Sequence, residues 1–481
     1  MYRMSWLLIL ILLVAIYAAV ALVIYKYLKT GFLIYPPAPE TTAIQSKEIL
    51  VPAKEGDIIQ YTPASSAGNT TPTKKFLEEH IAFYGPIMAI KTSKTAFFDW
   101  FTRISPMLRI YGSIGVIIVV LVSVLITFLL FFALQYTILL QPEPTGIYKP
   151  QNILLLPGIN EYVPSTFAVW FAFILTIAVH EFGHGILCRV ENIKVRGIGA
   201  LIAVIPIGFF VEPDEEELDK AKGMPKMRMF GAGIMNNLVV GAICFVLLIA
   251  VMGAAVPTNA PVVHGVYQNY SAYSAGLPQD SLIIAVNGVP VATRDEVSAI
   301  LNTSHPGDTA VLQVQKDSTI KDYTLNLTAW PAEFGTHTSG FMGVFYYDGG
   351  PVIDTVRNMF SPIGFLRLIS VPFDMSAGGQ YLRVLAFETP DTGYYTVPYP
   401  GIFWGLVHLL FWCGWININV GIFNAIPMVP LDGGYILKEG VERLFSGRKI
   451  EKYATFVATS ISTIMLVILV SLVALPYLLH I

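Results

Sequence analysis

Two histidines and a glutamate stand close together in the stretch His180-Glu181-Phe182-Gly183-His184. In a helix, side chains four residues apart lie one above the other on the same face, so both imidazoles can point at one ion. Imidazole nitrogens are common zinc ligands, and a glutamate beside the first histidine can act as general base on the water that zinc activates. The pattern therefore predicts a zinc site with His180 and His184 as ligands and Glu181 as the base.

The setting of this motif strengthens the prediction. In a soluble helix, H-E-x-x-H arises by chance so often that metal binding and a chance occurrence are about equally favoured. Here the motif lies near the end of a hydrophobic run, residues 166–188. A buried charge without a partner costs roughly several kcal/mol, and ionisable groups within apolar spans usually serve a function. The apolar surroundings therefore favour metal binding.

Composition places the chain among membrane proteins. Of its 481 residues, 54% are hydrophobic and 13% are charged, which is typical of a chain that crosses a bilayer several times. The formal net charge of -3 gives no indication of nucleic-acid binding. The three cysteines, Cys188, Cys244 and Cys413, all lie in hydrophobic runs, so we expect neither a disulfide framework nor a cysteine zinc site.

We predict a polytopic α-helical membrane protein of about six transmembrane helices. Between the third and fourth helices, the glycines and proline of 195–208 favour a hairpin or a re-entrant loop. Within the mixed segment before the second helix, residues 76–112 are typical of a membrane-surface helix or an ordinary packed helix. The expected divisions are 1–28 for the first helix, 29–112 for a mixed cytosolic segment, 113–141 for the second helix, 166–256 for the zinc-site core with the third and fourth helices, 401–434 for the fifth and 452–480 for the sixth.

Residues 257–332 have a different character, because charges return and short strands alternate with turns. We interpret 274–277, 282–288 and 311–314 as strand, hairpin and strand. This order resembles a circularly permuted PDZ domain, so the fold class includes a PDZ-like α+β insert. An extracytosolic connector, 333–400, leads from the insert to the fifth helix.

Lysine and arginine counts predict the orientation of the chain. Residues 29–112 hold nine, 189–228 seven and 435–452 five, whereas 142–165 hold only Lys149. We therefore expect a multi-pass membrane protein whose three basic segments face the cytosol. The metal then lies near the cytosolic side, and the PDZ-like insert is extracytosolic.

A zinc ion that activates water needs a third protein ligand, and Asp432 is the best candidate. It follows Pro427 and Pro430, which break the helix and free its backbone. Both His184 and Asp432 precede predicted cytosolic loops, so they share a depth in the membrane. Leu-Asp-Gly-Gly is also ordinary turn chemistry, but the position relative to the membrane favours the ligand.

The paired motifs H-E-F-G-H at 180–184 and N-A-I-P-M-V-P-L-D-G-G at 424–434 resemble the site-2 protease family of intramembrane zinc metalloproteases, peptidase family M50. The resemblance implies His180, His184 and Asp432 as ligands of Zn²⁺ and Glu181 as catalytic acid/base. It also implies Asn424 as a polar catalytic group, and leaves Asn237 between a site role and plain helix packing. Many members have Gly-Pro where this chain has Gly233-Ile234.

The resemblance implies hydrolysis of peptide bonds within the transmembrane segments of single-span membrane proteins that another protease has already trimmed. The expected partners are these substrates, the lipid bilayer and peptide C-termini at the PDZ-like insert, with no nucleic acid. A substrate helix must unwind before attack, and an edge strand within 196–208 is expected to bind the unwound segment by strand addition.

Three other classes of protein remain as alternatives. One is a catalytically silent scaffold that binds peptides through the PDZ-like insert, although a scaffold has no need of Glu181. Another is a membrane zinc protease of the prenyl-protein type, whose third ligand is usually a glutamate. The third is an ion transporter with a buried His/Asp site, which needs neither the base nor the insert.

Overall fold

The computed structural model describes residues 80–480 apart from 85–86, 153–154, 204, 347–348, 375 and 391–393. The predicted first helix, 1–28, and most of the segment 29–112 lie outside these residues. The chain forms two compact units, one containing Gly185–Ala221 together with the described residues up to Pro106, and the other comprising Met107–His184 and Lys222–Ile481. Each unit is described separately.

Five helices in the described part of the chain are long and apolar enough to cross a membrane. This confirms a polytopic membrane protein. Helix α3 begins earlier than the predicted 113, since a 3-10 helix, η1 (Ala96–Ile104), leads directly into it. The five are α3 (Ser105–Leu140), α4 (Phe167–Val190), α6 (Met224–Met252), α12 (Pro400–Asn424) and α14 (Ala454–Leu478), the last preceded by η6 (Glu451–Tyr453).

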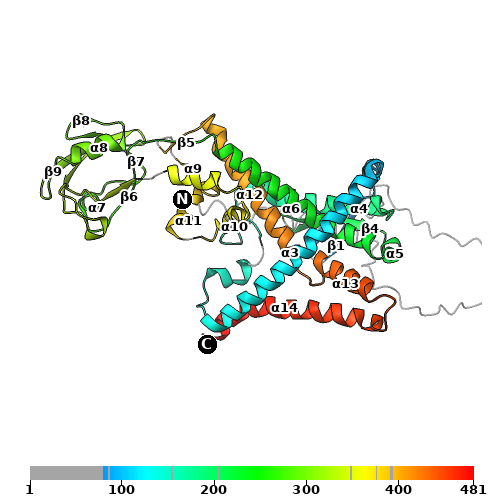
Figure 1. Cartoon of the computed structure of the whole chain (residues 1–481). Helices are drawn as coiled ribbons and strands as arrows, with labels where there is room; N and C mark the ends of the chain where they lie inside the picture. The colour runs from blue at the N-terminus through cyan, green and yellow to red at the C-terminus, as the bar shows by residue number, and fades with distance from the viewer. Residues whose placement is uncertain are drawn as a thin grey trace, which may run out of the picture. The chain divides into compact units, whose positions relative to one another are not determined.

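Helices α6 and α12 pack closely side by side (Figure 1). A Cβ atom at Gly414 would lie 2.4 Å from the Phe245 ring, and one at Gly241 would lie 2.6 Å from Ile418. Small residues at such crossings let two backbones approach, which is how membrane helices gain contact without a hydrophobic driving force. In contrast, α3 exposes large apolar side chains along its length, including Leu121, Leu125 and Phe128, as a lipid-facing helix does.

The predicted fifth helix, 401–434, is wrong in its second part. Helix α12 ends at Asn424, and Asp432 begins a separate helix, α13 (Asp432–Phe445). The glycines after Asp432 allow the new helix to start against the preceding loop, because a Cβ at Gly433 would lie 2.4 Å from the Ala425 carbonyl oxygen. The basic residues Lys438 and Arg443 therefore lie on α13 and not in a loop.

A four-stranded antiparallel sheet of order β1-β2-β3-β4 lies in the first unit. Its second half confirms the predicted hairpin between the third and fourth helices. Its first half corrects the interpretation of 76–112 as one helix, since 81–84 and 87–92 form strands. The strands are β1 (Ile81–Tyr84), β2 (Ile87–Thr92), β3 (Val195–Ala203) and β4 (Ile205–Pro213), and the short helix α5 (Glu215–Lys220) follows β4.

This strand order limits the predicted edge strand within 196–208 to its last residues, which begin β4. Strand β3 lies between β2 and β4, and both of its edges are paired. Within the described residues the free edges of the sheet belong to β1 and β4. Any strand added from outside would therefore pair with 205–213 or 81–84, and a proline at 199–204 would disrupt the sheet itself.

The insert after α6 is an α+β domain, as predicted. Its sheet has the order β10-β9-β7-β6-β11, with β8 paired to β7, so β11 is an edge strand that lies beyond the predicted boundary at 332. The predicted strand at 274–277 is wrong: a helix ends there, and Gly276 turns the chain with a φ of +70°. The elements are β6 (Val262–Val266), α7 (Ser271–Ser274), β7 (Ser281–Val286), β8 (Val289–Pro290), α8 (Arg294–Leu301), β9 (Thr309–Lys316), β10 (Thr319–Asn326), η4 (Ala332–Phe334) and β11 (Val344–Tyr346).

The connector before α12 consists mainly of short helices that join the large apolar core around Trp412 and Trp415. The indole nitrogens of these two residues donate to the carbonyls of Ala386 and Ile369, so the connector is tied to α12. Its elements are α9 (Gly350–Arg357), α10 (Pro362–Ser370), α11 (Ala377–Leu382), η5 (Arg383–Leu385) and β12 (Tyr395–Thr396), the last paired with β5 (Val256–Pro257); η2 (Gly146–Tyr148) and η3 (Pro150–Asn152) lie between α3 and α4.

Candidate metal centre

Helix α4 presents its two histidines on one face, as the spacing predicts. Nε2 of His180 lies 3.1 Å from Nε2 of His184, and the two rings meet edge to face at 4.8 Å. His180 is buried, with 8% of its surface exposed. The two nitrogens therefore converge on one point inside the protein.

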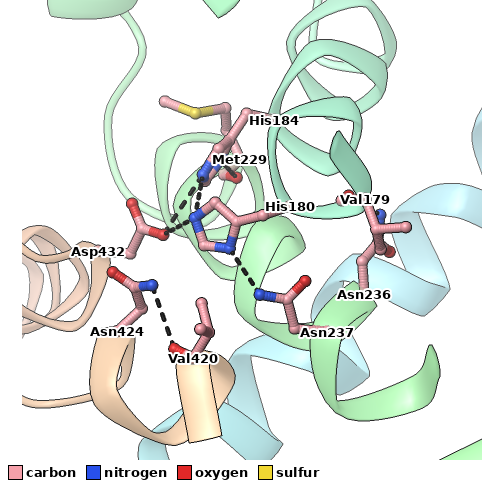
Figure 2. A network of polar contacts seen from close by, with 9 residues as sticks. All are labelled: Val179, His180, His184, Met229, Asn236, Asn237, Val420, Asn424 and Asp432. Atoms are coloured by element: carbon pink, nitrogen blue, oxygen red, sulfur yellow. Dashed lines mark hydrogen bonds and ion pairs between the residues drawn. The ribbon is translucent and has the colours of Figure 1, made fainter. Parts of the chain in front are cut away.

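Asp432 joins the histidines from the first residue of α13 (Figure 2). Its Oδ2 atom lies 3.0 Å from Nε2 of His180 and 3.3 Å from Nε2 of His184. The structure thus brings together the three predicted ligands, although Asp432 follows the two histidines by about 250 residues in the chain.

The hydrogen bonds around the rings determine whether these three atoms present lone pairs to a cation. Nδ1 of His184 lies 2.9 Å from the carbonyl oxygen of Met229, which can only accept, so Nδ1 carries the proton and Nε2 carries a lone pair. Oδ2 of Asp432 is buried, and its near polar neighbours among the described residues are the two Nε2 atoms. Lone pairs that face one another inside a protein repel, and a cation at their centre removes that repulsion.

The spacing of the three atoms fits zinc. Zinc–nitrogen and zinc–oxygen bonds of about 2.0–2.2 Å in a tetrahedron place neighbouring ligand atoms about 3.3–3.5 Å apart. The separations observed here are 3.0, 3.1 and 3.3 Å. Three protein ligands leave a fourth position for water or substrate, which is the arrangement of catalytic zinc sites.

Asn237 orients the second imidazole. This residue is fully buried on α6, and the nitrogen of its side-chain amide, as oriented in the structure, lies 3.1 Å from Nδ1 of His180. If Nε2 of His180 binds a metal, Nδ1 is protonated and needs an acceptor. The amide oxygen of Asn237 otherwise lacks a partner among the described residues, so we assign that oxygen to His180, an assignment that rests on the hydrogen-bond network.

Sequence reasoning missed Gly233 and Asn236, which shape the site from α6. A Cβ at Gly233 would lie 2.6 Å from Nε2 of His184, so only glycine leaves room for the rings. The Asn236 amide donates to the Val179 carbonyl and accepts from the Tyr111 hydroxyl, which links three helices. A signal for these residues exists in the sequence, because 231–237 are mostly small or polar. Close packing between helices explains that composition equally well.

Glu181 lies beside the two histidines. One of its carboxylate oxygens is within 4.8 Å of a ring nitrogen of each histidine. The side chain is half-buried, which leaves it accessible to a water molecule at the open position. A general base needs to reach its proton directly or through one water, and this distance allows either.

Asn424 is not brought into contact with the other predicted site residues among those described. It ends α12, and its side-chain amide donates to the carbonyl of Val420 one turn earlier, at 3.1 Å. Figure 2 shows Asn424 and Asp432 on the two sides of the break between α12 and α13. Its role as a catalytic group stays a prediction.

Comparison with known proteins agrees with this geometry. The model of peptidase family M50 matches residues 168–469, a range that includes all three ligand residues. The chain is similar to zinc metalloprotease RasP of Geobacillus kaustophilus (25% identical over 44% of this chain and 49% of the relative). It is also similar to RasP proteins of Oceanobacillus iheyensis (25%, over 52% and 59%) and of Bacillus subtilis, named regulator of sigma-W protease (25%, over 51% and 57%).

These matches confirm the predicted family, and the names agree with the predicted zinc cofactor. The chain spans only about half the length of the curated relatives it matches first.

Proposed function

The chain belongs to peptidase family M50, and we propose that it is an intramembrane zinc metalloprotease that hydrolyses peptide bonds within the transmembrane segments of other membrane proteins. The observation that carries this proposal is the convergence of two imidazole nitrogens and one carboxylate oxygen within 3.3 Å of each other, with both imidazoles on α4, a helix long and apolar enough to cross a membrane. The third ligand is an aspartate on α13, which argues against the prenyl-protein class of protease.

In this proposal His180, His184 and Asp432 hold the metal. Zinc in this position supplies a Lewis acid that lowers the pKa of water to about 7. Glu181 accepts the proton of the attacking water and returns it to the leaving amine. Met229 and Asn237 hold the two rings in the tautomer that directs both Nε2 lone pairs at the centre.

We propose that the substrate segment binds as an added strand. A transmembrane helix satisfies its backbone hydrogen bonds internally, so an unwound segment needs new partners. Strand β4 has a free edge within the described residues and follows α4, the helix of the histidines, after a single intervening strand. Pairing along 205–213 would hold the segment extended, which is the conformation that a protease cleaves.

The α+β insert offers a separate peptide site. A cavity of about 280 Å³ lies between α8 and the edge strand β11, and it is lined by Val297, Leu301, Phe341 and Val344. The Trp330 indole nitrogen and the Tyr346 hydroxyl also line it, and both are buried without a partner among the described residues. Burial raises the pKa of the Tyr346 hydroxyl, so it remains a donor. These features support the PDZ-like prediction and binding of a peptide C-terminus.

We further propose that the insert selects substrates. It is the predicted extracytosolic domain, and a substrate with a bulky folded outer domain would collide with it. Single-span proteins already trimmed by another protease would be accepted, and exclusion by collision is an effective source of specificity. The cytosolic placement of the metal and the total of six helices, including 1–28, remain parts of this proposal.

The decisive experiment uses Glu181→Gln in the full chain, purified and reconstituted with a single-span membrane peptide. Zinc content should stay equal to that of the unmodified protein, while the cleavage rate should fall by about 10²–10⁴-fold, the usual contribution of general acid–base catalysis. Glu191→Gln, one residue beyond the end of α4, is the matched control and should cleave normally. Normal cleavage by Glu181→Gln would disprove the assigned chemistry.

To find physiological substrates, membranes of cells with Glu181→Gln can be compared with membranes of cells with the unmodified chain. Single-span proteins that accumulate only in the variant are the expected substrates. If zinc is bound and no membrane protein accumulates, a scaffold becomes the better description.

A further inference from the structure

A buried ion pair lies between α6 and α13, away from the metal ligands. Glu439 is only 5% exposed, and its Oε1 atom lies 3.1 Å from Nζ of Lys226. The other oxygen, Oε2, accepts a hydrogen bond of 3.0 Å from the backbone N–H of Gly223, the residue that caps α6. Both oxygens of Glu439 are therefore occupied by α6.

The same two helices meet again one turn toward the metal centre. The rings of Phe230 and Tyr435 stack at 4.5 Å with an angle of 10° between their planes. One turn further, Gly233 on α6 leaves the space in which the histidine rings meet Asp432 on α13. Along α6 the positions are 226, 230 and 233, and along α13 their counterparts are 439, 435 and 432. Because one series rises while the other falls by the same steps, the two helices pack antiparallel in a single register.

This register connects the ion pair to the ligand. Glu439 is seven residues from Asp432, which is two helical turns or about 10.5 Å along the axis, on the same face. A shift of α13 by one residue would move Asp432 about 1.5 Å along that axis. Its Oδ2 atom would then no longer lie between the two Nε2 atoms, because those rings are fixed by Met229 and Asn237.

Stability alone does not explain the pair. Removing two charges from water costs about as much as their attraction returns, and apolar residues of similar volume often serve stability as well or better. The best-attested role of such a pair is to fix the register of packed helices.

We propose that Lys226 and Glu439 are positioning residues that set α13 against α6 and so hold Asp432 at the height of the two histidines. This inference rests on the proposed metal site. It concerns the affinity of that site for zinc, and it assigns neither residue a contact with metal or substrate.

The test measures zinc affinity by competition with a chelator, alongside the unfolding temperature of the metal-free full-length protein. Lys226→Met and Glu439→Gln should each weaken zinc binding by about 10–100-fold, the range found when groups behind the ligands are removed. Each single variant leaves one buried charge without its partner, so the metal-free unfolding temperature should fall as well, and the loss of zinc affinity should exceed what that fall accounts for. Lys438→Met and Glu442→Gln, on the same helix, are the matched controls and should bind zinc normally; Lys438 is exposed.

The double variant Lys226→Glu with Glu439→Lys keeps both charges but leaves the N–H of Gly223 without its acceptor, so it should recover part of the lost affinity. It also decides the matter if a single variant does not fold. Unchanged zinc affinity in the single variants, zinc loss that only follows loss of metal-free stability, or failure of the exchange would each overturn the inference. If the unmodified protein binds no zinc, the metal site itself is wrong; if Asp432→Asn loses zinc while Glu439→Gln retains it, only the inference about positioning fails.

Discussion

The metal centre and the cavity of the α+β insert differ in whether their buried polar groups have hydrogen-bond partners. Around the metal centre, the outward nitrogens of His180 and His184 each have a fixed partner on α6, and only the three converging atoms are left open. In the insert, the Trp330 nitrogen and the Tyr346 hydroxyl line the cavity without a partner among the described residues. The first region is organised by its own side chains, whereas the second holds two buried donors that no group of the described residues satisfies.

The comparison is tested most severely by removing a ligand. Asp432→Ala should lose zinc almost completely, as His180→Ala should, because two remaining ligands do not make a catalytic site. The loss should exceed the 10–100-fold or so expected for groups behind the ligands. Metal analysis of purified protein measures it, and full zinc occupancy in Asp432→Ala would remove this residue from the site.

A second test adds one carbon atom beside the histidine rings of the metal centre. In Gly233→Ala the new Cβ would lie 2.6 Å from Nε2 of His184, so a ring or a helix must move and zinc affinity should fall by more than about 100-fold. Gly231→Ala is the control, two residues earlier on the same helix, since its Cβ would meet Val116 at an ordinary 3.5 Å. Equal zinc binding by both variants would show that the site adapts.

Removing an orienting group should have a smaller effect. Asn237→Ala leaves all three ligands in place but frees the His180 ring, and we expect zinc affinity to fall by about 10–100-fold. Asn419→Ala is a suitable control because that side chain bonds only within its own helix, to the carbonyl of Trp415. An unchanged affinity in Asn237→Ala would mean that packing alone orients the ring.

The smallest effect on the metal should come from the insert. Replacing 262–346 by a flexible linker should leave zinc affinity within about twofold, because effects at well-separated sites are close to independent. Substrate choice should change, with cleavage extended to proteins that keep a large outer domain and trimmed substrates still cut. Comparing both substrate types decides this, and unchanged selectivity would rule out the filter.

The sequence predicted the ligand set because two different signals agreed. The i, i+4 spacing placed His180 and His184, and the position of Asp432 before a basic segment placed it at the same depth. The start of α13 was missed because Gly433 and Gly434 are also common turn residues. The need for glycine at these positions follows only from the three-dimensional structure, in which a Cβ at either residue would collide with the backbone of the loop before Asp432.

The β1–β2 hairpin was missed although a local signal exists. Two short apolar runs, 81–84 and 87–92, flank Gly85-Pro86, a dipeptide typical of turns. Aromatic and basic residues further along drew the interpretation toward a helix. The edge position of β4 could not be predicted from the sequence, because it depends on which of several strands pairs with β3.

The ladder between β2 and β3 constrains how this protein is assembled in its membrane. Lys91 pairs with Gly199 and Met88 with Ile202, across more than 100 residues that contain α3 and α4. If α3 and α4 each cross the membrane, as their length and composition indicate, the ladder requires the chain to cross and return, so that β2 and β3 lie on the same side. Contacts between such distant residues form late, and the sheet therefore reports a completed helical pair: a chain in which either helix failed to insert would leave β3 without its neighbour.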